Sequence, residues 1–188
     1  MKRIALIALT ASLSLPAFAA PETYVVEGTH TFPSFSYTHL GFSTQQSRFD
    51  KTSGKITIDR AAKTGSLDVS IDAKSVNTGV DVFNGHLKGE DYFNVEKFPV
   101  MTFKSSNFKF DGEKPATING ELTIKGITKP VTLVVTSFNC APHPFTKKEV
   151  CGANASTRIK RSEFNAGKNA PAVSDEVTLN IAVEAIKE

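Results

Sequence analysis

The sequence has no tryptophan, only two cysteines and two methionines, and little excess of either charge. Its 188 residues carry 22 basic and 19 acidic side chains, for a formal net charge of +3. A sequence with this charge balance has neither the basic patch of a nucleic-acid-binding protein nor the polybasic cluster of a protein that binds anionic membranes. We therefore expect no nucleic-acid partner, and only transient membrane contact stays open.

Long apolar runs are missing except at the N-terminus, where residues 4–15 follow a short basic start. This run is shorter than the roughly 20 apolar residues that a membrane-spanning helix needs. Pro16 and the sequence Ala17-Phe18-Ala19 then complete the layout of a secretory signal peptide. We expect residues 1–19 to be removed and residues 20–188 to form one domain in the bacterial periplasm.

The two cysteines, Cys140 and Cys151, are separated by ten residues. An even number of cysteines in an exported chain indicates a disulfide. The long spacing excludes a CxxC redox or zinc pair. We therefore predict that Cys140 and Cys151 are bridged.

Motifs for catalysis and metal binding are also missing. The sequence contains no nucleophile elbow, phosphate-binding glycine loop or HExxH motif. Its four histidines have no close ligand spacing and no adjacent carboxylate; they are His30, His39, His86 and His143. We therefore expect no enzymatic activity, no catalytic residues, no cofactor and no metal site.

Alternation of apolar and polar residues with a period of two dominates the chain, as in strands with one buried and one wet face. Residues 66–73 and 177–185 show it most clearly. Their apolar members should face the interior: Leu67, Val69, Ile71, Val177, Leu179 and Ile181. Their polar members should face water: Asp68, Ser70, Thr178 and Asn180.

Further candidate strands follow the same pattern. They are residues 24–39, 55–59, 100–104, 107–111, 118–124, 131–135 and 153–160. Glycine and proline mark short loops between several of them, as at residues 111–115 and 125–130, which favours hairpins. A series of eight or more such strands predicts an up-and-down β-barrel or a β-sandwich.

Residues 75–99 lack this alternation. Val80, Phe83 and Leu87 are spaced as one stripe of a helix, and Asn77 or Thr78 could cap its start. We predict one or two short helices here, which cross an end or a side of the barrel and cover its core.

Phenylalanine is the abundant aromatic residue, with 14 in the chain. Several of these lie where strand alternation is weakest. They could be ordinary core residues, because each ring buries a large area, or they could line an apolar cavity. The interior of an eight-stranded barrel is just wide enough to be filled by side chains or to hold one small ligand. Both interpretations therefore stay open.

Several short motifs follow one another along the chain. They are Gly28-Thr29-His30-Thr31-Phe32, Asn77-Thr78-Gly79, His86-Leu87-Lys88, Asp91-Tyr92-Phe93, Lys97-Phe98-Pro99, residues 120–131 and Arg161-Ser162-Glu163-Phe164. In this order they resemble the YceI-like family of periplasmic polyisoprenoid-binding proteins, over essentially all of residues 20–188. The chain departs from the family pattern at Asn165, where glycine is common.

The resemblance implies an all-β fold, a single extended antiparallel eight-stranded lipocalin-like barrel with an apolar channel. It implies a bound isoprenoid-type lipid, either a polyisoprenoid or an isoprenoid quinone-like molecule, for which the protein acts as a periplasmic carrier. Our candidates for the channel lining are Phe32, Phe35, Tyr37, Phe42, Phe49, Phe83, Leu87, Phe93 and Phe103.

Two alternatives to the carrier remain. A barrel filled by side chains would act as a ligand-free stress or interaction protein. An enzyme that acts on an isoprenoid lipid would use His39 or His86 as its acid or base. The chain length and head group of the ligand stay open, as does the choice between a monomer and a homodimer.

Overall fold

The structure is a computed structural model that describes residues 20–188, so the predicted signal peptide lies outside the described residues. The strands of residues 20–188 are β1 (Glu22–Val26), β2 (Ser34–His39), β3 (Ser43–Phe49), β4 (Thr52–Asp59), β5 (Thr64–Asp72), β6 (Val76–Asn77), β7 (Val100–Asp111), β8 (Lys114–Ile124), β9 (Ile127–Pro142), β10 (Glu149–Lys160) and β11 (Glu176–Lys187). The helical segments in this range are η1 (Ala73–Ser75), α1 (Asp81–Lys88) and η2 (Arg161–Phe164). None of these is a helix long and apolar enough to cross a bilayer.

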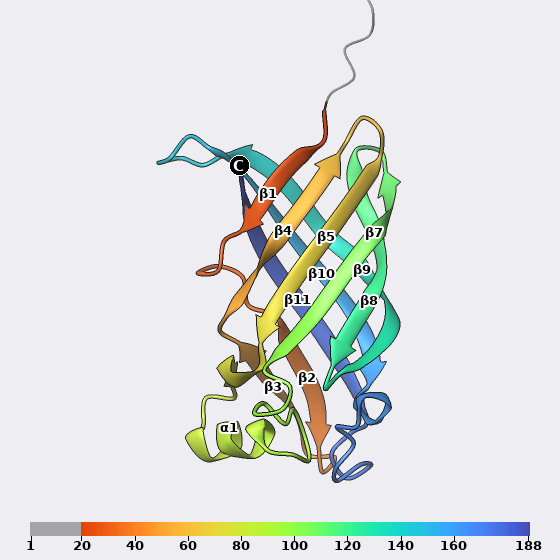
Figure 1. The fold of residues 1–188 in the computed structure, drawn as a ribbon. Helices are drawn as coiled ribbons and strands as arrows, with labels where there is room; N and C mark the ends of the chain where they lie inside the picture. The colour runs from red at the N-terminus through yellow and green to blue at the C-terminus, as the bar shows by residue number, and fades with distance from the viewer. Residues whose placement is uncertain (1–19) are drawn as a thin grey trace, which may run out of the picture.

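Eight of the strands in residues 20–188 close an antiparallel barrel (Figure 1). Their order is β1, β4, β5, β7, β8, β9, β10 and β11, and β11 pairs with both β10 and β1. The pairing of Val25 with Ile186 belongs to this closure. The predicted eight-stranded antiparallel barrel is therefore confirmed, and the sandwich alternative is wrong.

The first predicted strand, residues 24–39, is divided in two. β1 pairs with the end of β11, β2 pairs with its start, and residues 27–33 lie between them. β2, β3 and β6 extend the sheet at the end of the barrel where α1 lies (Figure 1). The sequence pattern did not predict β3, because most of its side chains are polar and only Ser47 and Phe49 are buried.

The predicted inward and outward faces of β5 and β11 are confirmed. Leu67, Val69 and Ile71 line the barrel interior, as do Leu179 and Ile181. The outward side chains of Asp68 and Asn180 are exposed. Since a shift of one residue would invert every side chain, the alternation alone defined these two faces.

The turn between β8 and β9 is shorter than predicted. Lys125 and Gly126 both have positive φ, 51° and 73°, as a tight two-residue hairpin turn requires. β9 therefore begins at Ile127 and includes Pro130. Proline is tolerated there because the pairing of β9 with β10 extends only to Val134, so its missing N–H leaves no bond unmade.

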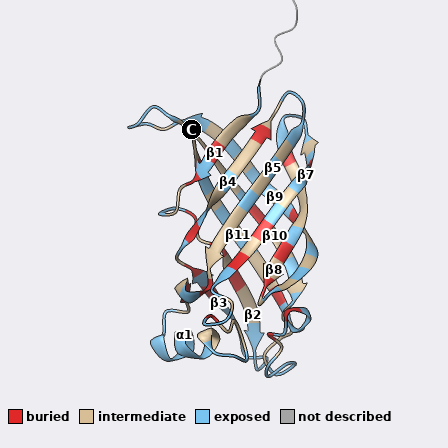
Figure 2. Ribbon diagram, viewed as in Figure 1, coloured by how far each residue is buried: buried red, intermediate tan, exposed pale blue. Residues whose placement is uncertain are grey.

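The helix in residues 75–99 is confirmed at one end of the barrel (Figure 1), but its cap differs from the prediction. Its N-cap residue is Val80, and no side chain caps it. The Asn77 side chain instead accepts a hydrogen bond from the Gly79 N–H (2.8 Å), which shapes the turn before the helix. No residue of α1 is fully buried (Figure 2), but Leu87 packs against the core, so the helix covers this end of the barrel with one side chain.

Candidate functional site

The barrel encloses an apolar cavity of about 160 Å³, here called the inner cavity. Inward-facing side chains from strands all around the barrel form its wall, among them Ile56, Val69, Ile118, Val135 and Ile181. These positions come from the period-two alternation, which places every second residue of a strand inside. The wall offers a guest molecule only hydrocarbon surface.

The inward-facing side chains remain partly accessible. Leu67, Ile71, Leu179 and Ile181 all line the inner cavity, yet none of them belongs to the fully buried residues. A barrel filled by its own side chains would have close-packed, inaccessible groups at these positions. The interior of this barrel therefore has room for a guest.

A second cavity, of about 480 Å³, lies at the end of the barrel beside α1 and is here called the mouth cavity. Its walls come from β2, from α1 with the segment that follows it, and from the connection between β10 and β11. Phe35, Phe49 and Leu179 line both cavities, so the two spaces adjoin.

Three phenylalanine rings meet where the cavities adjoin. The ring centroids of Phe35 and Phe49 are 5.7 Å apart, and the Phe93 ring lies 6.0 Å from the first and 5.3 Å from the second. Phe93 stands edge-on to both, an arrangement that aromatic pairs favour. Phe35 and Phe49 line both spaces and Phe93 packs on them from the mouth side, so the three rings lie at the junction of the cavities.

Arg161 shapes the wall formed by the connection between β10 and β11. Its guanidinium donates hydrogen bonds to backbone carbonyls of four residues in that connection: Ala166, Lys168, Val173 and Ser174. Asn165 ends η2 in the left-handed conformation, with φ 56°. Asparagine adopts this conformation more readily than most residues, which explains how it serves where the family commonly has glycine.

Polar contacts connect the two sides of the mouth cavity. The Lys168 ammonium lies 3.1 Å from the Asp91 carboxylate, and the Asn169 amide donates to the Tyr92 hydroxyl at 3.0 Å. Nearby, burial raises the pKa of the Tyr37 hydroxyl. Unlike the inner cavity, the mouth therefore offers polar groups beside its apolar walls.

His39 and His86 both line the mouth cavity. Within residues 20–188, no hydrogen bond orients either imidazole. A general acid or base usually needs a neighbouring group that fixes its orientation and tautomer. The two histidines are therefore brought to one cavity without forming an acid/base pair.

Seven of the nine lining candidates border a cavity. Phe35 and Phe49 border both, Phe103 borders the inner cavity, and the mouth cavity is bordered by Tyr37, Phe83, Leu87 and Phe93.

Phe32 and Phe42 line neither cavity. The guanidinium carbon of Arg48 lies over the Phe32 ring, 4.3 Å from the ring centroid. Phe42 lies in the turn between β2 and β3, where its side chain is 87% exposed. The wall of the inner cavity is largely aliphatic, and its members on β5 and β11 were predicted to face the interior from their alternation, although the nine lining candidates did not include them.

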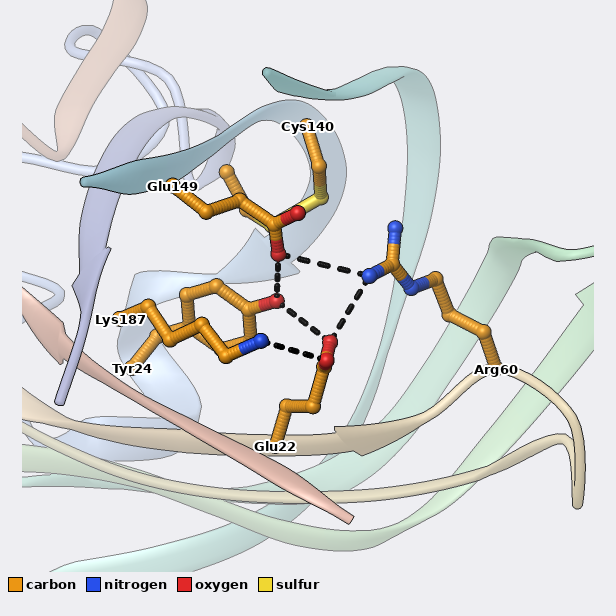
Figure 3. The surroundings of a disulfide bond; sticks show 7 residues. Glu22, Tyr24, Arg60, Cys140, Glu149 and Lys187 are labelled. Atoms are coloured by element: carbon orange, nitrogen blue, oxygen red, sulfur yellow. Dashed lines mark hydrogen bonds and ion pairs between the residues drawn. A yellow bond between two sulfur atoms is a disulfide. The ribbon is translucent and has the colours of Figure 1, made fainter. Parts of the chain in front are cut away.

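The opposite end of the barrel is closed by a polar cluster, Glu22, Tyr24, Arg60, Glu149 and Lys187 (Figure 3). The Glu22 carboxylate lies 2.6 Å from the Lys187 ammonium and 2.8 Å from the Arg60 guanidinium. Arg60 also reaches Glu149 at 3.4 Å. Two cations and two carboxylates thus balance one another, and they connect β1, β10, β11 and the turn after β4.

Tyr24 joins this cluster to the inner cavity. Its side chain is 1% exposed and lines the cavity, while its hydroxyl contacts both Glu22 and Glu149. Hydrogen bonding and charge from Lys187 lower the pKa of Glu22 to about 2. Burial raises the pKa of Tyr24, so the hydroxyl stays protonated and able to donate.

The predicted disulfide between Cys140 and Cys151 is present beside this cluster (Figure 3). It joins residues that face each other directly on β9 and β10. Cys151 also lines the inner cavity and packs with Tyr24 and Ala185. Because the charged cluster spans this end and the mouth cavity adjoins the inner cavity at the other, a guest would reach the inner cavity through the mouth.

Within residues 20–188, one group of three side chains could hold a metal ion: Glu27, His30 and Glu184. It lies on the outside of the barrel and borders neither cavity. The His30 imidazole is 2.7 Å from the Glu27 carboxylate, and Thr29 donates to the same carboxylate. These contacts account for the grouping without a metal ion.

Comparison with known proteins agrees with this architecture. The sequence model of the YceI-like domain matches residues 24–185. The UPF0312 protein of Enterobacter sp. strain 638 is 34% identical over 190 residues, which covers 100% of this chain and 98% of that protein.

Two solved structures have the same fold. BcnA of Burkholderia cenocepacia superposes with a TM-score of 0.73 at 28% identity, over 85% of this chain and 99% of that one. A polyisoprenoid binding domain from Saccharophagus degradans, implicated in plant cell wall breakdown, superposes with a TM-score of 0.63. At 18% identity, over 88% of this chain and 98% of that one, the second likeness concerns the fold alone.

Proposed function

The chain belongs to the family of YceI-like domains, and from this premise we propose that it is a periplasmic binding and carrier protein for a long isoprenoid-type lipid. The observation that carries the proposal is the accessible, wholly apolar interior of the barrel, which adjoins a mouth with polar groups. The Saccharophagus domain of the same fold is described as polyisoprenoid-binding.

The chemistry of such a ligand requires a carrier. Burying apolar surface is worth about 0.8 kcal/mol per CH2 group, so a long hydrocarbon chain does not move freely through an aqueous compartment. The signal-peptide pattern of residues 1–19 supports export to the periplasm, a compartment that lies between two membranes. A soluble barrel with a hydrocarbon interior could hold the tail during transfer.

The cavity sizes indicate how the ligand would be held. A dry apolar cavity near 150 Å³ accommodates about one benzene ring, and the inner cavity is about 160 Å³. A long tail therefore requires rotation of the rings of Phe35, Phe49 and Phe93, which joins the inner cavity to the mouth cavity. The head group would stay in the mouth, near Asp91, Lys168 and the Tyr92 hydroxyl.

The filled-barrel alternative is less well supported, because inward side chains such as Leu67 and Ile181 remain accessible. The enzyme alternative lacks an oriented acid/base pair, since neither His39 nor His86 is held by a hydrogen bond in the described chain.

The direct experiment is to purify the protein from the periplasm, extract it with organic solvent and identify the extracted lipid by mass spectrometry. We expect about one apolar isoprenoid-type lipid per protein. A second arm offers a polyprenol to protein from which lipid has been removed. Failure to recover or rebind a stoichiometric apolar lipid would contradict the carrier function.

A matched pair of variants tests where the lipid lies. Val69 lines the inner cavity, whereas Val134 on β9 faces outward and is 50% exposed. Val69→Phe should fill the inner cavity and lower polyprenol binding about tenfold or more, because the tail loses its apolar site. Val134→Phe adds the same ring outside the barrel and should leave binding unchanged. Equal effects of the two variants would place the ligand elsewhere.

A further inference from the structure

Exposed apolar side chains gather at the end of the barrel that carries the mouth cavity. We call them the apolar rim: Leu40, Phe42, Val80, Val82 and Phe83, which are 51%, 87%, 45%, 57% and 53% exposed. Leu40 and Phe42 lie in the turn between β2 and β3, and the others lie at the start of α1. Figure 1 shows this turn and α1 at the same end of the barrel.

Both parts of the rim border the opening itself. His39, just before the β2–β3 turn, lines the mouth cavity, as do Thr78 and Phe83 on the side of α1. The Phe42 N–H donates to the His39 carbonyl at 2.9 Å, so Phe42 lies in a tight turn directly after a residue that lines the opening. The rim therefore lies around the route by which a guest would reach the barrel interior.

The exposure of the rim is costly in water. Single exposed apolar residues are ordinary, but several of them on two segments beside the opening of an apolar cavity indicate an interaction surface. The helix carries part of this surface: Leu87 packs against the barrel core, whereas Val82 and Phe83 are 57% and 53% exposed. A short amphipathic helix with an uncovered apolar side is suited to the interface of a lipid bilayer.

Charges of both signs lie near the rim, and α1 itself carries Asp81 in its first turn and Lys88 in its last. Lys74 forms an ion pair with Glu96 at 3.0 Å, and Lys168 forms one with Asp91 at 3.1 Å. A surface with no excess of positive charge has little attraction for anionic lipid in particular. Contact with a bilayer would therefore depend on insertion of apolar side chains and would change little with salt.

We propose that the apolar rim docks on the surface of a lipid bilayer, so that the mouth opens directly toward the membrane from which an apolar ligand is taken. This inference rests on the proposed lipid-carrier function for its purpose, but the docking itself can be measured without any ligand. Phe42 and Val82 would insert among the lipid head groups, while Phe83 lies between the membrane and the mouth cavity.

The test measures co-flotation of the purified protein with vesicles of pure phosphatidylcholine, and with vesicles of phosphatidylethanolamine and phosphatidylglycerol. The variant Phe42→Ser/Val82→Ser removes two rim side chains that line neither cavity. We expect wild type to bind both kinds of vesicle similarly, and the variant to bind about tenfold less, since each side chain loses its apolar burial.

Phe145 supplies the matched control. It is 87% exposed, as Phe42 is, but it lies in the hairpin between β9 and β10 at the opposite end of the barrel (Figure 1). Phe145→Ser should leave vesicle binding unchanged. Docking is overturned if wild type does not bind vesicles, or if the Phe145 and rim variants lose binding equally.

Two further measurements separate the other outcomes. If light scattering shows a dimer that Phe42→Ser/Val82→Ser converts to a monomer, the rim is an interface between two copies and the docking proposal is wrong. Uptake of a fluorescent polyprenol should be slowed in the variant when vesicles supply it, but complete when ethanol supplies it. No uptake from either source would instead contradict the carrier function, while vesicle flotation still decides docking.

Discussion

The hydroxyl of Tyr24, on β1, donates a hydrogen bond to the carboxylate of Glu149, on β10, at the end of the barrel opposite α1. This contact joins strands that are 125 residues apart in the chain. Together with the Glu22 ion pairs it ties β1, β10 and β11 together across this end, beside the disulfide between β9 and β10. The two ends therefore differ in chemistry: ion pairs and a disulfide lie at one, and a cavity with exposed apolar side chains beside it lies at the other.

The closing cluster should make stability depend on pH in the acidic range. The pKa of Glu22 is about 2 in the folded protein, below its ordinary 4.5. The stabilisation is thus complete above about pH 4.5 and is lost as the pH falls through about 2, since the folded carboxylate must then be protonated. Glu22→Gln should lower stability by about 1 kcal/mol at neutral pH and reduce the loss in acid.

Thermal unfolding of both proteins from about pH 6 to pH 2 measures this effect. Glu188→Gln is the control, because Glu188 forms an exposed ion pair with Lys55 and should contribute little. Parallel stability curves for wild type and Glu22→Gln would contradict the role given to the cluster.

The disulfide should stabilise the closed end without being needed for the fold. A bridge that closes about 15 residues contributes about 3 kcal/mol in the chain-entropy model, and this one spans a sequence separation of 11. We expect Cys140→Ala/Cys151→Ala to lower the free energy of unfolding by about 2 kcal/mol and to keep the β-rich circular dichroism spectrum. Thiol titration of the unreduced, denatured wild type should find no free thiol, and two free thiols would refute the bridge.

Arg161 should be a positioning residue for the wall of the mouth cavity. Arg161→Lys keeps the positive charge but cannot reproduce the fork of donors to the carbonyls of Ala166, Lys168, Val173 and Ser174. We expect a loss of about 2 kcal/mol in stability, faster proteolysis within residues 165–175, and weaker polyprenol binding.

The same substitution at Arg158 is the control for that prediction. Arg158 is exposed on β10 and contacts Glu176 at 3.3 Å, so Arg158→Lys should change neither stability nor proteolysis. Equal proteolysis of both variants would show that the carbonyl contacts of Arg161 do not hold the wall.

Local chemistry in the sequence was enough to predict the barrel strands and their faces. A period of two is a property of each strand alone, so Leu67, Val69 and Ile71 could be assigned to the interior without knowledge of their partners. The disulfide followed for a similar reason, because Cys140 and Cys151 had no other partner in the chain. The order of motifs supplied the family, which the match over residues 24–185 confirms.

Tertiary structure alone decided which phenylalanines border the cavities. Phe35 and Phe42 are close in sequence, yet one is 8% exposed beside the inner cavity and the other is 87% exposed in a turn. Their difference arises from the end of β2 and the register of its pairing with β3, whose polar sequence carries no alternation. The polar cluster and the carbonyl contacts of Arg161 depend on residues brought together by barrel closure, and closure is a relation between distant strands that no local pattern encodes.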